Sequence, residues 1–158
     1  MKVTRIGARG AERPALLADD PDRPVDFLKA AYTVTRPNDS VLIPRRSAKS
    51  DWEVELAVVI GRTARYLDSP AQALDHVAGY AISNDGSEGE FRLERSHQWD
   101  LGKSCETFNQ LGPYLVTSDE IPDPDNLGLP GNPDLRPGDL AESELTGLGT
   151  QTQTFAEA

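Results

Sequence analysis

Alternating apolar and polar residues predict a β-strand in the stretch 51–61, which reads Asp-Trp-Glu-Val-Glu-Leu-Ala-Val-Val-Ile-Gly. Successive side chains of a strand point to opposite faces. One face therefore carries a row of large apolar residues, namely Trp52, Val54, Leu56, Val58 and Ile60. The other face begins with Glu53 and Glu55 and becomes apolar from Ala57 onward. Because the second half is apolar on both faces, we expect it to be covered on both sides.

The two glutamates, Glu53 and Glu55, lie side by side on one face of this predicted strand. A buried carboxylate carries a large desolvation cost, and a second like charge beside it adds to that cost. Two explanations follow from the pattern. Either this end of the strand opens to water, or a hard divalent cation is bound there by carboxylate oxygens.

The pattern elsewhere predicts short strands, many turns and few helices. Short strands are expected at 2–6, 41–43, 80–83, 114–117, 140–145 and 147–155. A helix is expected over 70–78, with Ser69 as its N-cap, Pro70 at its first position and one apolar face.

The strand at 80–83 ends in a sharp Asn-Asp-Gly-Ser turn, which places Asp85 at the end of a strand. Ser87 and Glu90 match a capping box, which predicts a helix that begins after Ser87. The segment 97–103 is expected to be a loop that carries Trp99 and Lys103.

The composition suits one acidic domain. The 158 residues are enough for a single core. With 26 acidic and 16 basic residues the formal charge is −10, so nucleic acid and anionic membranes are not expected partners. An anionic substrate would depend on a local metal ion or lysine. Arg45, Arg46 and Lys49 form a small basic cluster, either a solvated loop or an anion-steering patch.

Cys105 is the single cysteine, so no intramolecular disulfide is possible. The first residues lack the apolar run of a signal peptide, and no window reaches the length of a membrane span. These features predict a cytoplasmic protein.

Several blocks occur in an order that is hard to obtain by chance. They are 51–61, then 77–85 (Val-Ala-Gly-Tyr-Ala-Ile-Ser-Asn-Asp), then 99–108 (Trp-Asp-Leu-Gly-Lys-Ser-Cys-Glu-Thr-Phe), then 111–113 (Leu-Gly-Pro). This order resembles the fumarylacetoacetate hydrolase family over about residues 27–127. Further similar pieces lie at 135–139 and 147–151.

The resemblance implies a mainly β fold with a few helices (α+β), a mixed β-roll or distorted barrel that is incomplete in this chain. Residues 1–26 are then an N-terminal strand and linker remnant, and residues 27–158 are the catalytic-type domain. Proteins of this family usually form homodimers. They act on small β-diketo or 2-oxo acids by C–C hydrolysis, decarboxylation or isomerisation, with Mg²⁺ or the related Mn²⁺ or Ca²⁺.

Carried over position by position, the resemblance implies that Glu53, Glu55 and Asp85 are the metal ligands and that Lys103 is a catalytic lysine. Three carboxylates give a hard site that leaves positions for water and substrate. Cleavage beside a carbonyl moves charge onto an enolate, which a Lewis-acidic metal and the Lys103 ammonium would stabilise.

The chain also departs from the family pattern. The family continues after the ligand aspartate with Ser-x-Arg-(Asp/Glu)-x-Gln, whereas this chain reads Ser-Glu-Gly-Glu-Phe-Arg over 87–92. Gly89 therefore stands at the arginine position. Arg92 stands at the glutamine position and is predicted to be a substrate-binding cation. Barrel strands and a Thr-Gly-Thr-Pro substrate loop are missing between Asn126 and the block 135–139.

Two functions remain open. The first is a metal-dependent hydrolase or lyase that acts on a small oxo acid. The second is a catalytically impaired remnant that serves as a metal-binding or dimerising module, and Gly89, Arg92 and the missing loop support it. A third explanation is that the sequence is an incomplete version of a longer enzyme.

Overall fold

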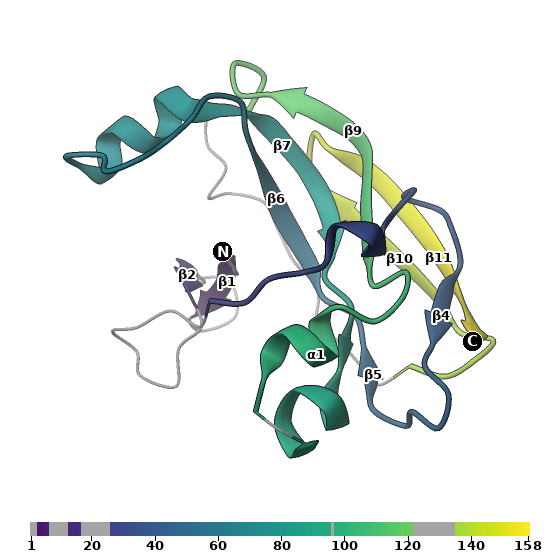
Figure 1. Cartoon of the computed structure of the whole chain (residues 1–158). Coiled ribbons are helices and arrows are strands. Elements are labelled where there is room, and N and C mark those ends of the chain that lie inside the picture. The colour runs from purple at the N-terminus through teal and green to yellow at the C-terminus, as the bar shows by residue number, and fades with distance from the viewer. Residues whose placement is uncertain (1–2, 7–12, 17–25, 96, 122–134) are drawn as a thin grey trace.

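Seven strands form the two main sheets of the computed structural model, which describes residues 3–6, 13–16, 26–95, 97–121 and 135–158. The larger sheet has the order β3 (Val34–Thr35), β9 (Asn109–Thr117), β7 (Val77–Asn84) and β6 (Val54–Ile60). The smaller sheet has the order β10 (Leu140–Leu145), β11 (Gly149–Glu157) and β4 (Val41–Ile43). Figure 1 shows these strands curling side by side into part of a barrel.

The main core lies between the two sheets. Its buried apolar side chains are Val41, Ile43, Trp52, Val54, Tyr80, Ile82, Phe108, Ile121, Leu135, Ala141, Leu145, Leu148 and Phe155. The sheets are also joined by a polar contact, because Nε2 of the buried Gln151 donates to the carbonyl oxygens of Ile82 (3.0 Å) and Gly112 (2.6 Å). The mainly β fold with few helices, and its incomplete barrel, are as the sequence predicts.

Two small antiparallel ladders complete the strand pairing. The first pairs β1 (Val3–Ile6) with β2 (Arg13–Leu16). The second pairs β5 (Ser50–Asp51) with β8 (Ser87–Glu88). The β5–β8 ladder matters for function because it ties the segment before Glu53 to the segment after Asp85.

The predicted strand 51–61 is two strands, because β5 pairs with β8 whereas β6 pairs with β7. Glu53 lies in the short break between them. The expected cover on both sides is wrong for the second half, since Val58 is 39% and Ile60 58% exposed. Within the described chain, β6 is the edge strand of its sheet.

The predicted helix over 70–78 is also wrong in type and length. A 3₁₀ helix, η2 (Pro70–His76), occupies most of this range, and Ser69 makes no side-chain cap bond. Val77 and Ala78 belong to β7, which pairs with neighbouring strands on both sides. Because the strand takes these two apolar residues, η2 retains no buried residue.

The turn and loop after Asp85 differ from the prediction as well. Ser87 lies in β8 and does not cap a helix, while a π-helix, η3 (Glu90–Arg95), begins three residues later. The expected loop at 97–103 contains a short α-helix, α1 (Trp99–Lys103). A 3₁₀ turn, η1 (Ala31–Thr33), precedes β3.

The other predicted strands are confirmed, although β7 and β9 extend well beyond the ranges 80–83 and 114–117. Most of the predicted linker, at residues 17–25, and the segment 122–134, where the family's barrel strands are missing, lie outside the described residues. The division at residue 26 stays a prediction. Among the described helices, none has both the length and the apolar character needed to cross a bilayer.

Candidate functional site

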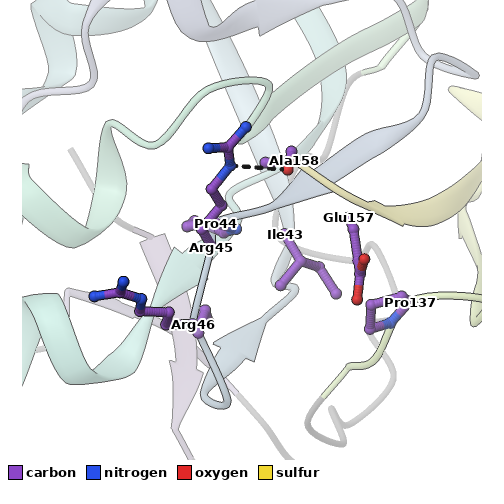
Figure 2. Close-up of a pocket in the computed structure, with 8 residues that line it drawn as sticks. Ile43, Pro44, Arg45, Arg46, Pro137, Glu157 and Ala158 are labelled. Atoms are coloured by element: carbon purple, nitrogen blue, oxygen red, sulfur yellow. Dashed lines mark hydrogen bonds between the residues drawn. The ribbon is translucent and has the colours of Figure 1, made fainter.

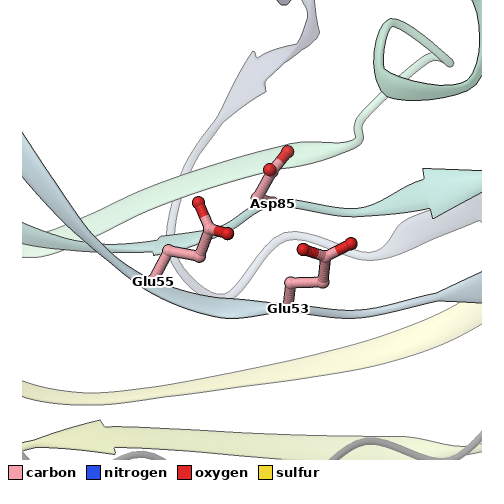
Figure 3. Close-up of side chains that lie close together, drawn as sticks. All are labelled: Glu53, Glu55 and Asp85. Atoms are coloured by element: carbon pink, nitrogen blue, oxygen red, sulfur yellow. The ribbon is translucent and has the colours of Figure 1, made fainter. Parts of the chain in front are cut away.

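Three carboxylates meet where β6 and β7 lie side by side. Glu53 directly precedes β6, Glu55 is its second residue, and Asp85 directly follows β7. One carboxylate oxygen of each residue lies within 4.8 Å of the others. Figure 3 shows the three side chains close together, rising to the same side of these neighbouring segments. The antiparallel pairing of the two strands thus places side by side the three residues that the sequence predicts as ligands.

This donor set fits a hard divalent cation. Oxygen ligands lie about 2.0–2.1 Å from Mg²⁺ and about 2.3–2.6 Å from Ca²⁺, so oxygens on opposite sides of such an ion are roughly 4–5 Å apart. The 4.8 Å span of the three carboxylate oxygens falls in this range. Glu53, Glu55 and Asp85 are therefore the residues that could hold an ion.

Lys103, the last residue of α1, binds two of the three carboxylates. Its Nζ donates to Glu53 Oε1 (2.8 Å), to Asp85 Oδ2 (2.9 Å) and to the Asp85 carbonyl oxygen (3.1 Å). The side chain is fully buried. Because an ammonium has three N–H groups, each of them is donated to a protein oxygen in this arrangement.

A second lysine, Lys29, was not identified from the sequence. Its Nζ donates to Asp85 Oδ1 (2.5 Å) and to the Gly86 carbonyl oxygen (3.0 Å). Burial lowers the pKa of the Lys29 ammonium, whereas the charge of Asp85 and its hydrogen bond oppose that shift. The one available signal was its place at the start of the region that resembles the family.

Arg92, on η3, is a second cation in contact with Glu53. Its Nη1 donates to Glu53 Oε1 (3.1 Å) and to Ser87 Oγ (3.0 Å), and Ser87 Oγ itself donates to Glu53 Oε1 (2.9 Å). The guanidinium carbon lies 4.9 Å from the centre of the Trp99 ring. Ser87 is therefore a site residue that the capping-box interpretation missed.

The site is close to electrically balanced. Two of the three carboxylates, Glu53 and Asp85, are in contact with three side-chain cations, namely Lys29, Lys103 and Arg92. For Glu53, the positive charge that a buried carboxylate requires is thus supplied by the protein itself. At the margin of the cluster, burial raises the pKa of Asp51, and the charge of Glu53 adds to that shift.

Close backbone packing brings these groups together. A Cβ on Gly102 would lie 2.5 Å from the Glu88 carbonyl oxygen and 2.7 Å from the Arg92 Cβ, so α1 sits directly against β8 and η3. This contact places Lys103, the next residue, beneath the carboxylates. The Asp85 amide donates to the Glu53 carbonyl oxygen (2.8 Å), which ties two ligand-bearing segments to each other.

A cavity of about 470 Å³ lies beside the carboxylates. Its charged end is formed by Lys29, Glu55 and Asp85. Its remaining lining is Phe27, Leu28, Leu56, Ala57, Val58, Ile60, Ser83, Asn109 and Leu111. Neither Lys103 nor Arg92 is among the described residues that line it. Of the three cations in the site, Lys29 therefore lines the cavity, whereas Lys103 and Arg92 contact the carboxylates away from it.

The basic cluster lies at a separate place. Arg45 and Arg46 border a cavity of about 300 Å³, where Arg45 Nε donates to the Ala158 carbonyl oxygen (3.3 Å). In Figure 2 the Arg46 side chain points away from Glu157. Lys49 pairs with Glu94, and both side chains are about half exposed. These three cations are exposed, in agreement with the solvated-loop interpretation.

The structure therefore gathers all five predicted site residues in one place, while the roles assigned to them stay predictions. The predicted metal ligands are Glu53, Glu55 and Asp85. Lys103 and Arg92 both donate to Glu53, and neither lines the cavity.

A family model described as "Fumarylacetoacetate (FAA) hydrolase C-terminal" matches residues 3–131. Two curated proteins named "Putative hydrolase" are similar over 109 residues, one from Burkholderia ambifaria (53% identical) and one from Burkholderia orbicola (52% identical). Each match covers 69% of this chain and 38% of the relative. The chain thus spans well under half the length of these relatives.

Solved structures share the fold. The crystal structure of 5-carboxymethyl-2-hydroxymuconate delta-isomerase from Mycobacterium smegmatis matches with a TM-score of 0.80 and 25% identity, over 99% of this chain and 75% of that chain. A fumarylacetoacetate hydrolase from Exiguobacterium antarcticum matches with a TM-score of 0.76 and 24% identity, over 86% of this chain and 67% of that chain. The second likeness concerns the fold alone.

Proposed function

Because the chain belongs to the fumarylacetoacetate hydrolase family, we propose that it is a metal-dependent hydrolase or lyase that cleaves a C–C bond of a small β-diketo or 2-oxo acid. The observation that carries the proposal is the cluster of Glu53, Glu55 and Asp85, whose ligand oxygens lie within 4.8 Å of one another. The buried Lys103, bonded to two of these carboxylates, supports it.

Glu53, Glu55 and Asp85 would hold Mg²⁺, with Mn²⁺ or Ca²⁺ as alternatives, because all three ions accept oxygen ligands. When bound, such an ion would act as a Lewis acid toward a carbonyl oxygen of the substrate. Since Glu55 and Asp85 line the cavity, an ion held by them would be accessible to a substrate in that cavity.

Lys29 is suited to attract the substrate. It lines the cavity, and its two hydrogen bonds to Asp85 and Gly86 leave one of its three N–H groups for a substrate carboxylate. In a chain with a formal charge of −10, an acid needs such a local cation. The apolar side chains of Leu56 and Leu111 would then lie along the rest of a small substrate.

Lys103 stays the predicted catalytic lysine. A buried ammonium stabilises negative charge that develops on a nearby oxygen, because the surrounding dielectric constant is low. In the present arrangement Lys103 holds Glu53 and Asp85 with all three N–H groups. Direct contact with a reacting oxygen therefore requires the exchange of one of these bonds.

The charge balance favours a second function, a folded module that does not turn over substrate. Three side-chain cations already form ion pairs with Glu53 and Asp85. The cluster can therefore persist as a structural ion network without an ion, as in the impaired remnant considered above. Gly89 and Arg92, which replace the residues of the family pattern, are consistent with it.

Titration with Mg²⁺ and Mn²⁺ in a calorimeter, with melting temperatures measured in parallel, tests the proposal. We expect the wild type to bind the ion and to melt at a higher temperature when it is bound, because binding to the folded state alone stabilises that state. Glu53→Ala is expected to lose both effects. Glu94→Ala is the matched control, since Glu94 pairs with Lys49 on the surface and should leave binding unchanged.

Turnover separates the two candidate functions. Loss of an acylpyruvate or of oxaloacetate, followed by absorbance, is expected with the metal-loaded wild type and not with Glu53→Ala. Metal binding without turnover of either compound class would support the module. If neither variant binds metal, the enzyme proposal is wrong for this chain.

A further inference from the structure

From its contacts we infer that Arg92 is a positioning residue for the ligand Glu53 and does not bind substrate. Its place in the family pattern predicts a substrate-facing side chain, because glutamine stands there in the resemblance. In the structure the Arg92 side chain instead contacts Glu53, because its Nη1 donates to Glu53 Oε1 at 3.1 Å. The cavity beside the carboxylates is lined by Glu55, Asp85 and Lys29, and Arg92 does not contribute to that lining.

Several neighbouring groups stabilise the contact between Arg92 and Glu53. The Arg92 side chain is 15% exposed and that of Glu53 is 13% exposed, so the pair is largely shielded from water. The guanidinium carbon lies 4.9 Å from the centre of the Trp99 ring, a cation–π distance that fixes its position. Ser87 Oγ bridges the two, because it accepts from Arg92 and donates to Glu53.

These contacts act on one oxygen atom of the metal ligand. Glu53 Oε1 accepts from Lys103 (2.8 Å), from Ser87 (2.9 Å) and from Arg92 (3.1 Å). Three donors on one oxygen fix the rotation of the carboxylate and therefore the direction of the whole group toward Glu55 and Asp85. Partners that orient a ligand in this way tune metal affinity, and their loss typically costs 10–100-fold in affinity.

The inference rests on the proposed metal site for one of its two tests. In the first test, the affinity for Mg²⁺ is measured by calorimetry for the wild type and for Arg92→Gln, Arg92→Lys and Arg95→Gln. We expect Arg92→Gln to weaken binding about 10–100-fold and Arg92→Lys to weaken it less, because the charge remains while the planar fork is lost. Arg95 lies one turn further along η3 and pairs with Glu90 on the surface, so Arg95→Gln should leave binding unchanged.

The same experiment distinguishes positioning from substrate binding. Oxalate, a mimic of a 2-oxo acid, is titrated into protein saturated with Mn²⁺. We expect wild type and Arg92→Gln to bind oxalate with the same affinity. Unchanged metal affinity together with weakened oxalate binding would overturn the inference and restore the substrate-binding role.

A second test needs no metal, so it remains decisive if the wild type binds none and the proposed function fails. Melting temperatures are compared for Arg92→Gln, Glu53→Gln and the double variant. We expect Arg92→Gln to lower the melting temperature by roughly 4 °C or more in the wild type and to have little effect in the Glu53→Gln background. Additive effects of the two changes would show that Arg92 does not act through Glu53, and the inference would be wrong.

Discussion

The two ends of β6 differ in which side chains they bury. We call the end beside Glu53 the near end and the end at Ile60 the far end. At the near end, Glu53 and Lys103 are charged and shielded from water, and each is matched by groups of opposite charge. At the far end, Val58 and Ile60 are apolar and substantially exposed, and Leu74 on η2, the next helix along the chain, is 64% exposed. Polar groups are thus buried at one end and apolar groups face water at the other.

The difference shows where the described chain satisfies its own side chains and where it leaves apolar side chains uncovered. Buried charges are costly to desolvate and are tolerated only with well-placed partners, which the near end supplies from β8, η3, α1 and the segment before η1. Exposed apolar side chains gathered at one edge are typical of surfaces that contact another segment or another chain. The homodimer expected from the family stays a prediction, and the far end is where we would look for its interface.

The largest expected effect tests the near end. Replacement of Lys103 by methionine leaves Glu53 and Asp85 buried with one cation fewer, and removal of one partner from a buried ion pair costs about 3–5 kcal/mol. We expect a loss of this size in the free energy of unfolding, measured with urea in metal-free protein. Lys49→Met is the control, because its pair with Glu94 is exposed and screened by water, so its loss should change stability little. Equal stability of the two variants would contradict the comparison.

A matched pair of isoleucines tests both ends with the same chemical change. Ile82, on β7, is fully buried in the core, whereas Ile60, on β6, is 58% exposed. We expect Ile82→Ala to lower the free energy of unfolding by about 2–5 kcal/mol. Ile60→Ala should lower it by less than about 1 kcal/mol. If Ile60→Ala proved as costly as Ile82→Ala, the far end would be covered in solution, most simply by a second copy of the chain.

Strand periodicity could predict that the residues of the site lie close together, whereas only the resemblance to the family implied that all three are metal ligands. Glu53 and Glu55 are two residues apart and so share a face, and Asp85 follows directly after the next strand. Pairing of β6 with β7 then brings the three together. The mainly β fold could be predicted for the same reason, since alternation and turn residues are local signals.

The remainder depends on contacts between distant segments. Lys29 meets Asp85 across 56 positions of sequence, and nothing in its local pattern distinguishes it from a surface lysine. Ser87 fits a helix cap as well as a strand, and pairing of β8 with β5 decides between them. The short α1 is specified by packing of Gly102 against η3, which no periodicity over five residues could reveal.

A smaller effect on stability is expected from Gly102, which allows α1 to pack closely against β8 and η3. Gly102→Ala would place a methyl group within 2.5 Å of the Glu88 carbonyl oxygen, so α1 or η3 has to move. Overpacking of this kind costs about 1–3 kcal/mol, and urea unfolding measures it. Gly138→Ala is not a suitable control because its φ of 97° adds strain, whereas Glu106→Ala changes an exposed side chain shortly after α1 without new bulk. A Gly102→Ala variant with wild-type stability would show that the near end is looser than the structure indicates.

The smallest effect concerns Cys105, which follows α1 and packs against the core at the near end. Burial raises the pKa of its thiol from 9.0 to about 11. Because the thiolate is the reactive form, alkylation of the folded protein by iodoacetamide should rise with a midpoint near pH 11, and near pH 9 in denaturant. The folded state binds this proton more tightly than the unfolded state does, so the thiol's contribution to stability is complete below pH 9 and is lost as the pH rises through 11. Cys105→Ser should remove this part of the pH dependence. A midpoint near 9 in the folded protein would mean that water reaches the near end freely, and the contrast between the two ends of β6 would then lose its physical basis.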